Sequence, residues 1–280
     1  MGVLNVTPDS FSDGGRFLDP DAAIAHGLRL LAEGADVVDV GGESTRPGAA
    51  PVPVATETDR VVPVVEALAG HVRVSVDTRR REVAEAAVAA GATLINDVSA
   101  ELWPVAAEAG VGWVAMHMRG APPTMQDEPH YDDVVAEVGA FLMERAQAAV
   151  QGGVGEVWVD PGIGFGKTSA HNLTLLAHLR VLVALGRPVL VGTSRKAFLG
   201  ALAGGSPPGD RLEGSLATAV WAMTQGVGMV RVHDVAATVG AARLVGPDAD
   251  ATGGEATGGE ARSRAQHEQG ARTGNGGDAL

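Results

Sequence analysis

The sequence predicts an α/β protein: a single (β/α)8 TIM barrel over residues 1–246, followed by a disordered tail over residues 247–280. The first observation is a recurring pattern in which an Ala-rich segment ends at a glycine and a short apolar run then closes on a polar residue. Glycine caps helix ends, and continuous apolar runs are typical of parallel strands covered on both faces. The second observation is that eight such strands alternate with helices over about 245 residues, which favours a barrel over an open doubly wound sheet.

Each element follows from this pattern in chain order. Strands are expected at residues 3–5, 37–40, 74–77, 94–96, 113–117, 157–160, 189–191 and 229–233. Helices are expected at residues 21–33, 57–69, 81–90, 132–149, 171–185, 212–225 and 235–244. Asp19 before Pro20, and Thr56 before Asp59, are typical of helix starts. The first strand begins almost at Met1, so either further chain precedes it or this strand is exposed to fraying.

The composition changes abruptly after Gly246. The tail consists mainly of Gly, Ala, Thr and charged residues, and contains the near-repeat 251–255 and 256–260 without apolar periodicity. Such a segment cannot bury enough apolar surface to offset the entropy of ordering, so we expect it to be disordered.

Charge and composition exclude several classes of protein. The net charge of −13 argues against nucleic-acid binding, which needs a basic face. The absence of cysteine excludes disulfides and thiolate chemistry. No apolar run approaches the ~20 residues of a membrane span, and the N-terminus carries no basic segment followed by an apolar one. We therefore expect a cytoplasmic protein without nucleic-acid or membrane partners.

Polar residues follow nearly every predicted strand. The C-terminal strand ends of a barrel face one mouth, so these side chains converge although they lie far apart in sequence. A single such residue is more often a cap or loop residue, but a full set predicts one small-molecule active site. Of 21 basic residues only Lys167 and Lys196 are lysines, and both lie just past strands. The candidate site comprises Asn5, Asp77, Asn96, Asp160, Lys196, Arg231 and His233.

Three glycine-rich loops, at 12–15, 41–48 and 160–167, follow predicted strands 1, 2 and 6. Glycine permits the close backbone approach that ligand loops need, so the first two are candidate mobile lids and the third a pocket wall. The spacing in 162–167 is too short for a phosphate-binding Walker loop. Because no His-x-x-x-His spacing occurs, a structural zinc site is not expected.

Seven motifs together resemble the dihydropteroate synthase family in order and spacing. They are Met1–Gly15, Val38–Gly48, Ser75–Thr78, Ile95–Val98, Asp160–Lys167, Thr193–Lys196 and Val230–Asp234. The resemblance covers about residues 1–245. That family is a (β/α)8 barrel that joins 7,8-dihydropterin-6-ylmethyl diphosphate to 4-aminobenzoate in folate biosynthesis, releasing diphosphate.

The resemblance implies a role for each site residue. Asp160 would accept hydrogen bonds from the pterin N3–H and 2-amino group, and Asp77 and Asn96 would meet the remaining positions of the pyrimidine side. Lys196 would reach the ring carbonyl and N5, and Arg231 would lie along the ring and donate to the diphosphate. Asp77, Asp160, Lys196 and Arg231 are thus the expected catalytic residues. Asn5 would bind Mg²⁺, and His233 would hold diphosphate oxygens.

The resemblance also implies that diphosphate departs before the amine attacks. Thr45, Arg46 and Pro47, with Phe11, would close over the cationic intermediate and form the 4-aminobenzoate pocket with Phe165. Ala197 stands where parts of the family have serine, which affects the same pocket. A homodimer is implied too.

Four strand-end residues receive a different interpretation. Asp39 and Glu43 are expected to brace a loop or cap a helix rather than to contact substrate. His117 is expected to lie outside the site, and Lys167 is compatible with a place in the site or behind it.

Two other functions are compatible with the motifs. A pterin-dependent methyltransferase shares the pterin-binding acids and Asn, but the Ser-Thr-Arg-Pro-Gly loop and the Thr-Ser-Arg-Lys motif argue against it. A catalytically silent pterin-binding paralogue would have lost a strand-end residue or loop motif, and neither is missing. Only the exposed first strand favours that alternative.

Overall fold

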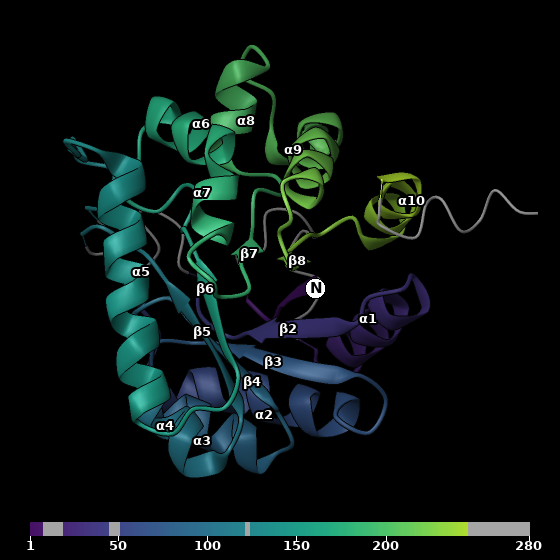
Figure 1. Cartoon of the computed structure of the whole chain (residues 1–280). Coiled ribbons are helices and arrows are strands. Elements are labelled where there is room, and N and C mark those ends of the chain that lie inside the picture. The colour runs from purple at the N-terminus through teal and green to yellow at the C-terminus, as the bar shows by residue number, and fades with distance from the viewer. Residues whose placement is uncertain (8–18, 45–50, 121–123, 246–280) are drawn as a thin grey trace, which may run out of the picture. The chain divides into compact units, whose positions relative to one another are not determined.

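The computed structural model describes residues 1–7, 19–44, 51–120 and 124–245. Strands and helices alternate through this part of the chain (Figure 1). The strands are β1 Gly2–Asn5, β2 Val37–Gly41, β3 Arg73–Asp77, β4 Leu94–Asp97, β5 Gly112–Met116, β6 Val157–Asp160, β7 Leu190–Val191 and β8 Met229–Val230. The helices are α1 Pro20–Ala32, α2 Val54–Leu68, α3 Arg81–Ala89, α4 Trp103–Ala109, α5 Val134–Gln151, α6 Ser169–Ala177, α7 Leu179–Val183, α8 Ala197–Leu202, α9 Leu212–Thr224 and α10 Val235–Val245.

All pairings between these strands are parallel. Strands β1 to β6 form one sheet in chain order, and β7 pairs with β8. Isolated parallel bridges, Val159 with Val189 and Gly2 with Val232, join this pair to the two edges of the six-stranded sheet. The Val3 amide donates to the Val232 carbonyl at 3.0 Å, which makes the second junction a hydrogen-bonded one. The eight strands therefore close into the predicted barrel.

The register places polar strand ends in one layer. Asn5 is paired with Gly41, Gly41 with Asp77, and Asp77 with Asn96. Because side chains two residues apart along a strand share a face, Asp39 lies on the same face one layer below Gly41. The fold thus stacks two levels of polar groups at the mouth of the barrel.

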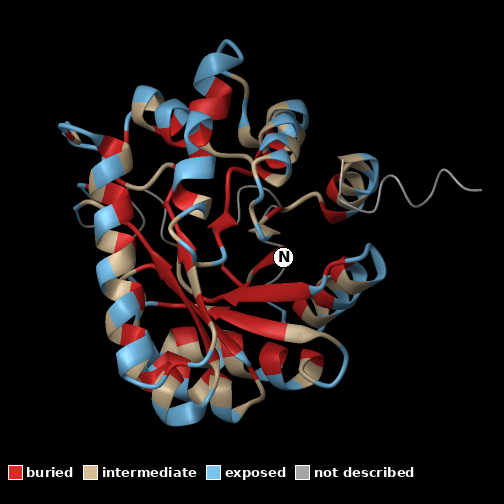
Figure 2. Ribbon diagram, in the orientation of Figure 1, coloured by how far each residue is buried: buried red, intermediate tan, exposed pale blue. Residues whose placement is uncertain are grey.

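The strands are the most buried part of the molecule, and the helices expose their outer faces (Figure 2). Leu4, Val40, Val76 and Ile95 are fully buried, as expected for a core of aliphatic side chains. The fraying expected for the first strand is not observed. Met1 is buried, its amino group donates to the Val230 carbonyl at 3.0 Å, and β1 pairs with β2 on its other side.

Helix starts were predicted with mixed success. The Asp19 carboxylate accepts from the Asp21 amide at 3.1 Å, with Pro20 in the first turn, as expected. Helix α2 instead begins at Val54 after Pro53, so the start predicted at Thr56 is wrong. Proline fixes the backbone angle that a first turn needs and replaces a side-chain cap there.

The helix pattern was also incomplete. The predicted helix 171–185 is divided at His178 into α6 and α7. Helices α4 and α8, of seven and six residues, were not predicted, because such short segments do not establish a helical period. Strands β7 and β8 are shorter than expected, with two residues each.

Several predicted features lie outside the described residues. These are most of the first two glycine-rich loops, with Phe11, Thr45, Arg46 and Pro47, and the tail 247–280. Among the described residues, no helix is both long and apolar enough to cross a membrane.

Candidate active site

A cavity of about 810 Å³ opens at the C-terminal ends of the strands. Every predicted site residue that the structure describes lines it, from six different strands or the loops that follow them. These residues are Asn5, Asp77, Asn96, Asp160, Phe165, Lys196, Arg231 and His233. Residues distant in sequence are therefore brought together as the barrel argument predicted.

Arg231 is held by two carboxylates. Its Nε donates to Asp39 Oδ2 at 2.6 Å, and its Nη2 donates to Asp77 Oδ2 at 2.8 Å. Burial alone would lower the pKa of Arg231, but the charges of Asp39 and Asp77 outweigh burial and raise it. Arg231 is therefore a fixed cation in the cavity wall.

The two acids of the cavity carry raised pKa values. Burial raises the pKa of Asp77 to about 7, with Arg231 opposing the shift and the Asp39 carboxylate adding to it. Burial also raises the pKa of Asp160, against the attraction of Lys196. Asp160 Oδ1 accepts from the Gly162 amide at 2.7 Å, whereas the buried Asp77 Oδ1 has no partner among the described residues. Both carboxylates line the cavity, and each has one oxygen without a hydrogen-bond partner among the described residues.

Lys196 extends into the cavity from the loop after β7. Its Nζ donates to the Ile163 carbonyl and lies 4.4 Å from the centre of the Phe165 ring. Burial lowers the pKa of Lys196 to about 8, and Asp160 opposes that shift. The ammonium group therefore lies over an aromatic face and is attracted by the charges of Asp160 and Asp77.

The third glycine-rich loop follows β6 and is anchored through its own backbone. Four successive carbonyls, from Ile163 to Gly166, each accept a hydrogen bond from a different side chain. The donors in that order are Lys196, Gln126 at 2.7 Å, Lys167 at 3.0 Å and Tyr131 at 2.9 Å. The Gly164 amide in turn donates to Asn172 Oδ1 at 2.7 Å. This wall of the cavity is rigid because its polar backbone atoms are bonded on several sides.

Two glycines allow the loop to approach the end of β5. Gly162 and Gly166 have φ angles of +63° and +59°, which other residues rarely adopt. A Cβ atom at Gly162 would overlap the His117 carbonyl, and one at Gly166 would overlap the Arg119 carbonyl. The glycines of this motif are thus required by geometry.

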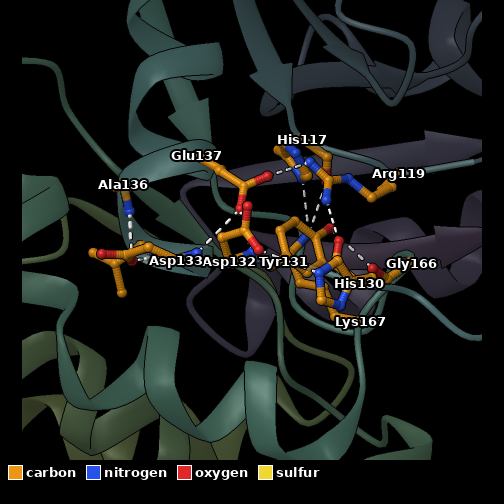
Figure 3. A network of polar contacts seen from close by, with 11 residues as sticks. His117, Arg119, His130, Tyr131, Asp132, Asp133, Ala136, Glu137, Gly166 and Lys167 are labelled. Atoms are coloured by element: carbon orange, nitrogen blue, oxygen red, sulfur yellow. Dashed lines mark hydrogen bonds and ion pairs between the residues drawn. The ribbon is translucent and has the colours of Figure 1, made fainter.

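Behind this loop lies a network of polar contacts that is buried at His117 and Lys167 and partly exposed at Arg119 and Glu137 (Figure 3). Lys167 Nζ lies 2.9 Å from His117 Nδ1, and Arg119 pairs with Glu137 at 2.6 Å while stacking 3.9 Å above the Tyr131 ring centre. Burial lowers the pKa of Lys167 to about 7, and burial with the nearby Lys167 charge lowers that of His117 to about 3. Neutral His117 can then accept from Lys167. Lys167 lines the cavity, whereas His117 is not among the lining residues.

Glu43 contacts the arginines that follow β3. It pairs with Arg79 at 3.0 Å and Arg80 at 2.7 Å, and it accepts from the Val52 amide at 3.2 Å. These contacts connect two flanks of the second glycine-rich loop, in agreement with the bracing role expected for Glu43. Asp39, in contrast, contacts the cavity residues Asn96 and Arg231.

Sequence reasoning missed part of the cavity wall. Met125, Gln126 and Pro129, from the loop between β5 and α5, line the cavity. Their segment has neither a glycine pattern nor a strand end, so no local signal identifies it. Arg211, which precedes α9, also lines the cavity and donates to the Arg195 carbonyl at 2.9 Å.

Asn5 is the one predicted metal ligand. Its amide lines the cavity and has no hydrogen-bond partner among the described residues. Those residues also contain no cluster of three acids or histidines suited to a metal ion. A side-chain amide oxygen fits Mg²⁺, which is often bound by few protein groups together with substrate phosphates. The Asn5 amide oxygen is therefore compatible with Mg²⁺ bound through few protein groups.

The fold and cavity define a barrel enzyme that takes a small polar ligand between acids, an amide and fixed cations. The profile of the family described as Pterin binding enzyme matches residues 1–233. The dihydropteroate synthase of Mycobacterium leprae is 50% identical over 260 residues, covering 88% of this chain and 92% of that protein. The chain belongs to the dihydropteroate synthase group of the pterin-binding enzyme family.

Solved structures agree with this assignment. The dihydropteroate synthase of Yersinia pestis, in a complex with a sulfonamide drug, matches with a TM-score of 0.85 and 46% identity, covering 90% of this chain and 94% of that one. The enzyme of Xanthomonas albilineans, in complex with 7,8-dihydropteroate, matches with a TM-score of 0.79 and 48% identity, covering 91% and 93%. These matches favour the synthase over the methyltransferase alternative.

Proposed function

We propose that the chain condenses 7,8-dihydropterin-6-ylmethyl diphosphate with 4-aminobenzoate, giving 7,8-dihydropteroate and diphosphate in folate biosynthesis. The observation that supports this most strongly is the convergence of Asp77, Asn96, Asp160, Lys196 and Arg231 on one cavity. The same cavity contains acceptors for a donor-rich heterocycle and cations for an anionic leaving group. A relative of 48% identity is itself complexed with 7,8-dihydropteroate.

The acids recognise the pterin ring in this proposal. Asp160 uses one oxygen on the Gly162 amide, so the other meets the ring N3–H and 2-amino group. Asp77 Oδ1 and the Asn96 amide meet the remaining positions of the pyrimidine side. Charge-assisted bonds are stronger than neutral ones, and they favour a ring that carries positive charge.

Arg231 and His233 serve the departing diphosphate. Both contact its oxygens, and Ser194 Oγ, 3.0 Å from His233 Nδ1, orients the imidazole. Preorganised charges of this kind stabilise the negative charge that develops as the C–O bond breaks. Mg²⁺, held by Asn5 and the diphosphate, would supply further Lewis-acid stabilisation of that charge.

The arylamine attacks from the side of Phe165. The Phe165 ring packs over Lys196, which leaves an apolar face against which a benzene ring can lie. Ala197 lines this part of the cavity and offers no hydroxyl, so the carboxylate of 4-aminobenzoate would be bound by backbone amides or by Thr45 and Arg46. The amine is nucleophilic when neutral, and no strong general base is required. Exclusion of water protects the cationic intermediate from hydrolysis.

The proposal places the reaction in the cytoplasm and the chain in a homodimer. The location is the one expected from the sequence, and the homodimer is implied by the resemblance to the family. Light scattering of the purified protein tests the homodimer.

One assay tests the function itself. Purified protein with the pterin diphosphate, Mg²⁺ and radiolabelled 4-aminobenzoate should form labelled dihydropteroate. Boiled protein and a reaction without pterin are the controls. Failure of intact, folded protein to form product would contradict the proposal and favour the silent paralogue.

A further inference from the structure

The fully buried carboxylate of Asp39 lies beneath the cavity and joins two residues of its wall. Asp39 is absent from the residues that line the cavity. Its Oδ2 nevertheless accepts from Arg231 Nε at 2.6 Å and from Asn96 Nδ2 at 3.0 Å. Arg231 follows β8 and Asn96 lies on β4, so one oxygen atom connects opposite parts of the barrel rim.

We infer that Asp39 is a positioning residue for pterin recognition, because it fixes the orientation of the Asn96 amide and of the Arg231 guanidinium. This inference rests on the proposed function. It replaces the expectation, drawn from the sequence, that Asp39 braces a loop or caps a helix.

The contact with Asn96 determines which atoms the amide presents to a ligand. One Nδ2–H is taken by Asp39, so Oδ1 and the second N–H are left for the cavity. A rotation of the amide by 180° would place Oδ1 against a carboxylate oxygen, and the two acceptors would repel each other. Asn96 therefore meets the ring with its oxygen in a fixed position.

The contact with Arg231 acts in the same way. Asp39 and Asp77 bind Nε and Nη2, so the guanidinium plane is fixed along two of its edges. Without Asp39 the side chain would keep only the bond to Asp77, about which it can turn. A bidentate or two-point arrangement restricts the orientation of arginine far more than one bond does.

The chain contains a matched control in Glu57. This carboxylate on α2 is also fully buried, accepts from the Thr78 hydroxyl at 2.7 Å, and lies 3.3 Å from Arg80 Nε. Asp39 and Glu57 each have one buried oxygen without a hydrogen-bond partner among the described residues. Glu57 does not line the cavity, and neither Thr78 nor Arg80 does. Loss of either acid removes a comparable buried network, but only Asp39 contacts the site.

The experiment compares Asp39→Ala, Asp39→Asn and Glu57→Ala by steady-state kinetics and thermal unfolding. For Asp39→Ala the KM for the pterin diphosphate should rise about 10- to 100-fold, as expected for a lost bond to a charged group. The KM for 4-aminobenzoate should stay within about twofold of the original value, since the geometry of Phe165 and Lys196 is untouched. For Asp39→Asn the KM for the pterin diphosphate should lie between those of the original protein and Asp39→Ala, because the amide oxygen can still accept both bonds. Glu57→Ala should lower the Tm and leave both KM values unchanged.

Equal changes in both KM values, or a pterin effect in Glu57→Ala as large as in Asp39→Ala, would overturn the inference. If Asp39→Ala does not fold, Asp39→Asn decides, and a pterin KM equal to that of the original protein rejects the role.

A second readout is independent of turnover. The chain has four asparagines, so selective ¹⁵N-Asn labelling gives few side-chain amide signals. The Asn96 signals should shift and broaden in Asp39→Ala and stay unchanged in Glu57→Ala. Unchanged Asn96 signals in both variants would refute the orientation by Asp39 even if the protein is active. Conversely, a shift without any turnover by the original protein would reject the proposed function alone.

Discussion

Two walls of the cavity are built in different ways. On one wall, charged side chains bind each other: Asp39 and Asp77 hold Arg231, and Asp39 holds Asn96. On the other wall, the loop Ile163–Gly166 is held through its carbonyls by side chains from three segments. Substitutions that change charge should affect the first wall. The second wall should respond mainly to substitutions that add atoms where its backbone is closely packed. The predictions below separate the two.

The largest effect is expected for Gly162→Ala, on the backbone wall. The new Cβ would overlap the His117 carbonyl at a φ angle of +63°, so the loop must move. A displacement near 1 Å can reduce activity about 100-fold, and we expect kcat/KM to fall by that factor with a lower Tm. Gly155→Ala is the control, because an added Cβ there meets no atom within 4 Å. Activity near that of the control would show that this wall is more compliant than its hydrogen bonds indicate.

Asp160→Asn changes the charged wall without changing its shape. The amide oxygen should keep the bond from the Gly162 amide, which leaves an NH₂ group where the pterin needs an acceptor. We expect normal folding and pterin affinity lower by about 10- to 100-fold, measured by calorimetry. Unchanged affinity would remove Asp160 from the recognition of the ring.

A smaller effect concerns Lys167, whose ammonium caps the Phe165 carbonyl behind the loop. Its pKa is lowered from 10.5 to about 7 in the folded protein by burial. Between these values the unfolded chain binds more protons, so the free energy of unfolding should rise with pH above 7. The rise is at most about 1.4 kcal/mol per pH unit.

Urea denaturation at pH 7, 8 and 9 measures this contribution. The Lys167→Met variant lacks the titrating group. The free energy of unfolding of the original protein should therefore increase relative to that of the variant as pH rises. Parallel pH profiles would indicate that Lys167 keeps its proton throughout this range.

The smallest effect is expected for deletion of residues 247–280. Their composition predicts disorder, and every predicted site residue precedes them. Turnover and Tm should therefore be unchanged in the truncated chain. A large loss of either would contradict the disordered-tail prediction.

The contrast between the two walls also explains which site residues could be predicted from the sequence. Asp77, Asn96, Asp160 and Arg231 were identified because parallel strands of a barrel bring polar strand ends to one mouth, whatever their separation in sequence. The resemblance to a family then supplied their roles. The convergence itself follows from alternation of strands and helices and needs no knowledge of side-chain contacts.

The backbone wall was only partly predictable. Its glycines marked a loop, but nothing in the sequence indicates that Gln126 and Tyr131 reach the carbonyls of Gly164 and Gly166. The contacts of Asp39 with the cavity residues were not predicted for a related reason. Its position at a strand end was visible, but its contacts depend on how far the Arg231 side chain extends from β8 into the barrel. Such distances are set by tertiary packing and leave no local pattern.

The closure of the ring has a consequence for dynamics. One isolated bridge, supported by backbone hydrogen bonds, joins the β7–β8 pair to each edge of the six-stranded sheet. Lys196 and Arg231 belong to the two-stranded part, whereas Asp77 and Asp160 of the cavity wall, and Asp39 beneath it, belong to the six-stranded part. A substrate bound between the groups that line the cavity would connect the two-stranded part of the barrel to the six-stranded part. Amide hydrogen exchange in β7 and β8 would then slow when the cavity fills, because a ligand that binds the closed barrel stabilises it.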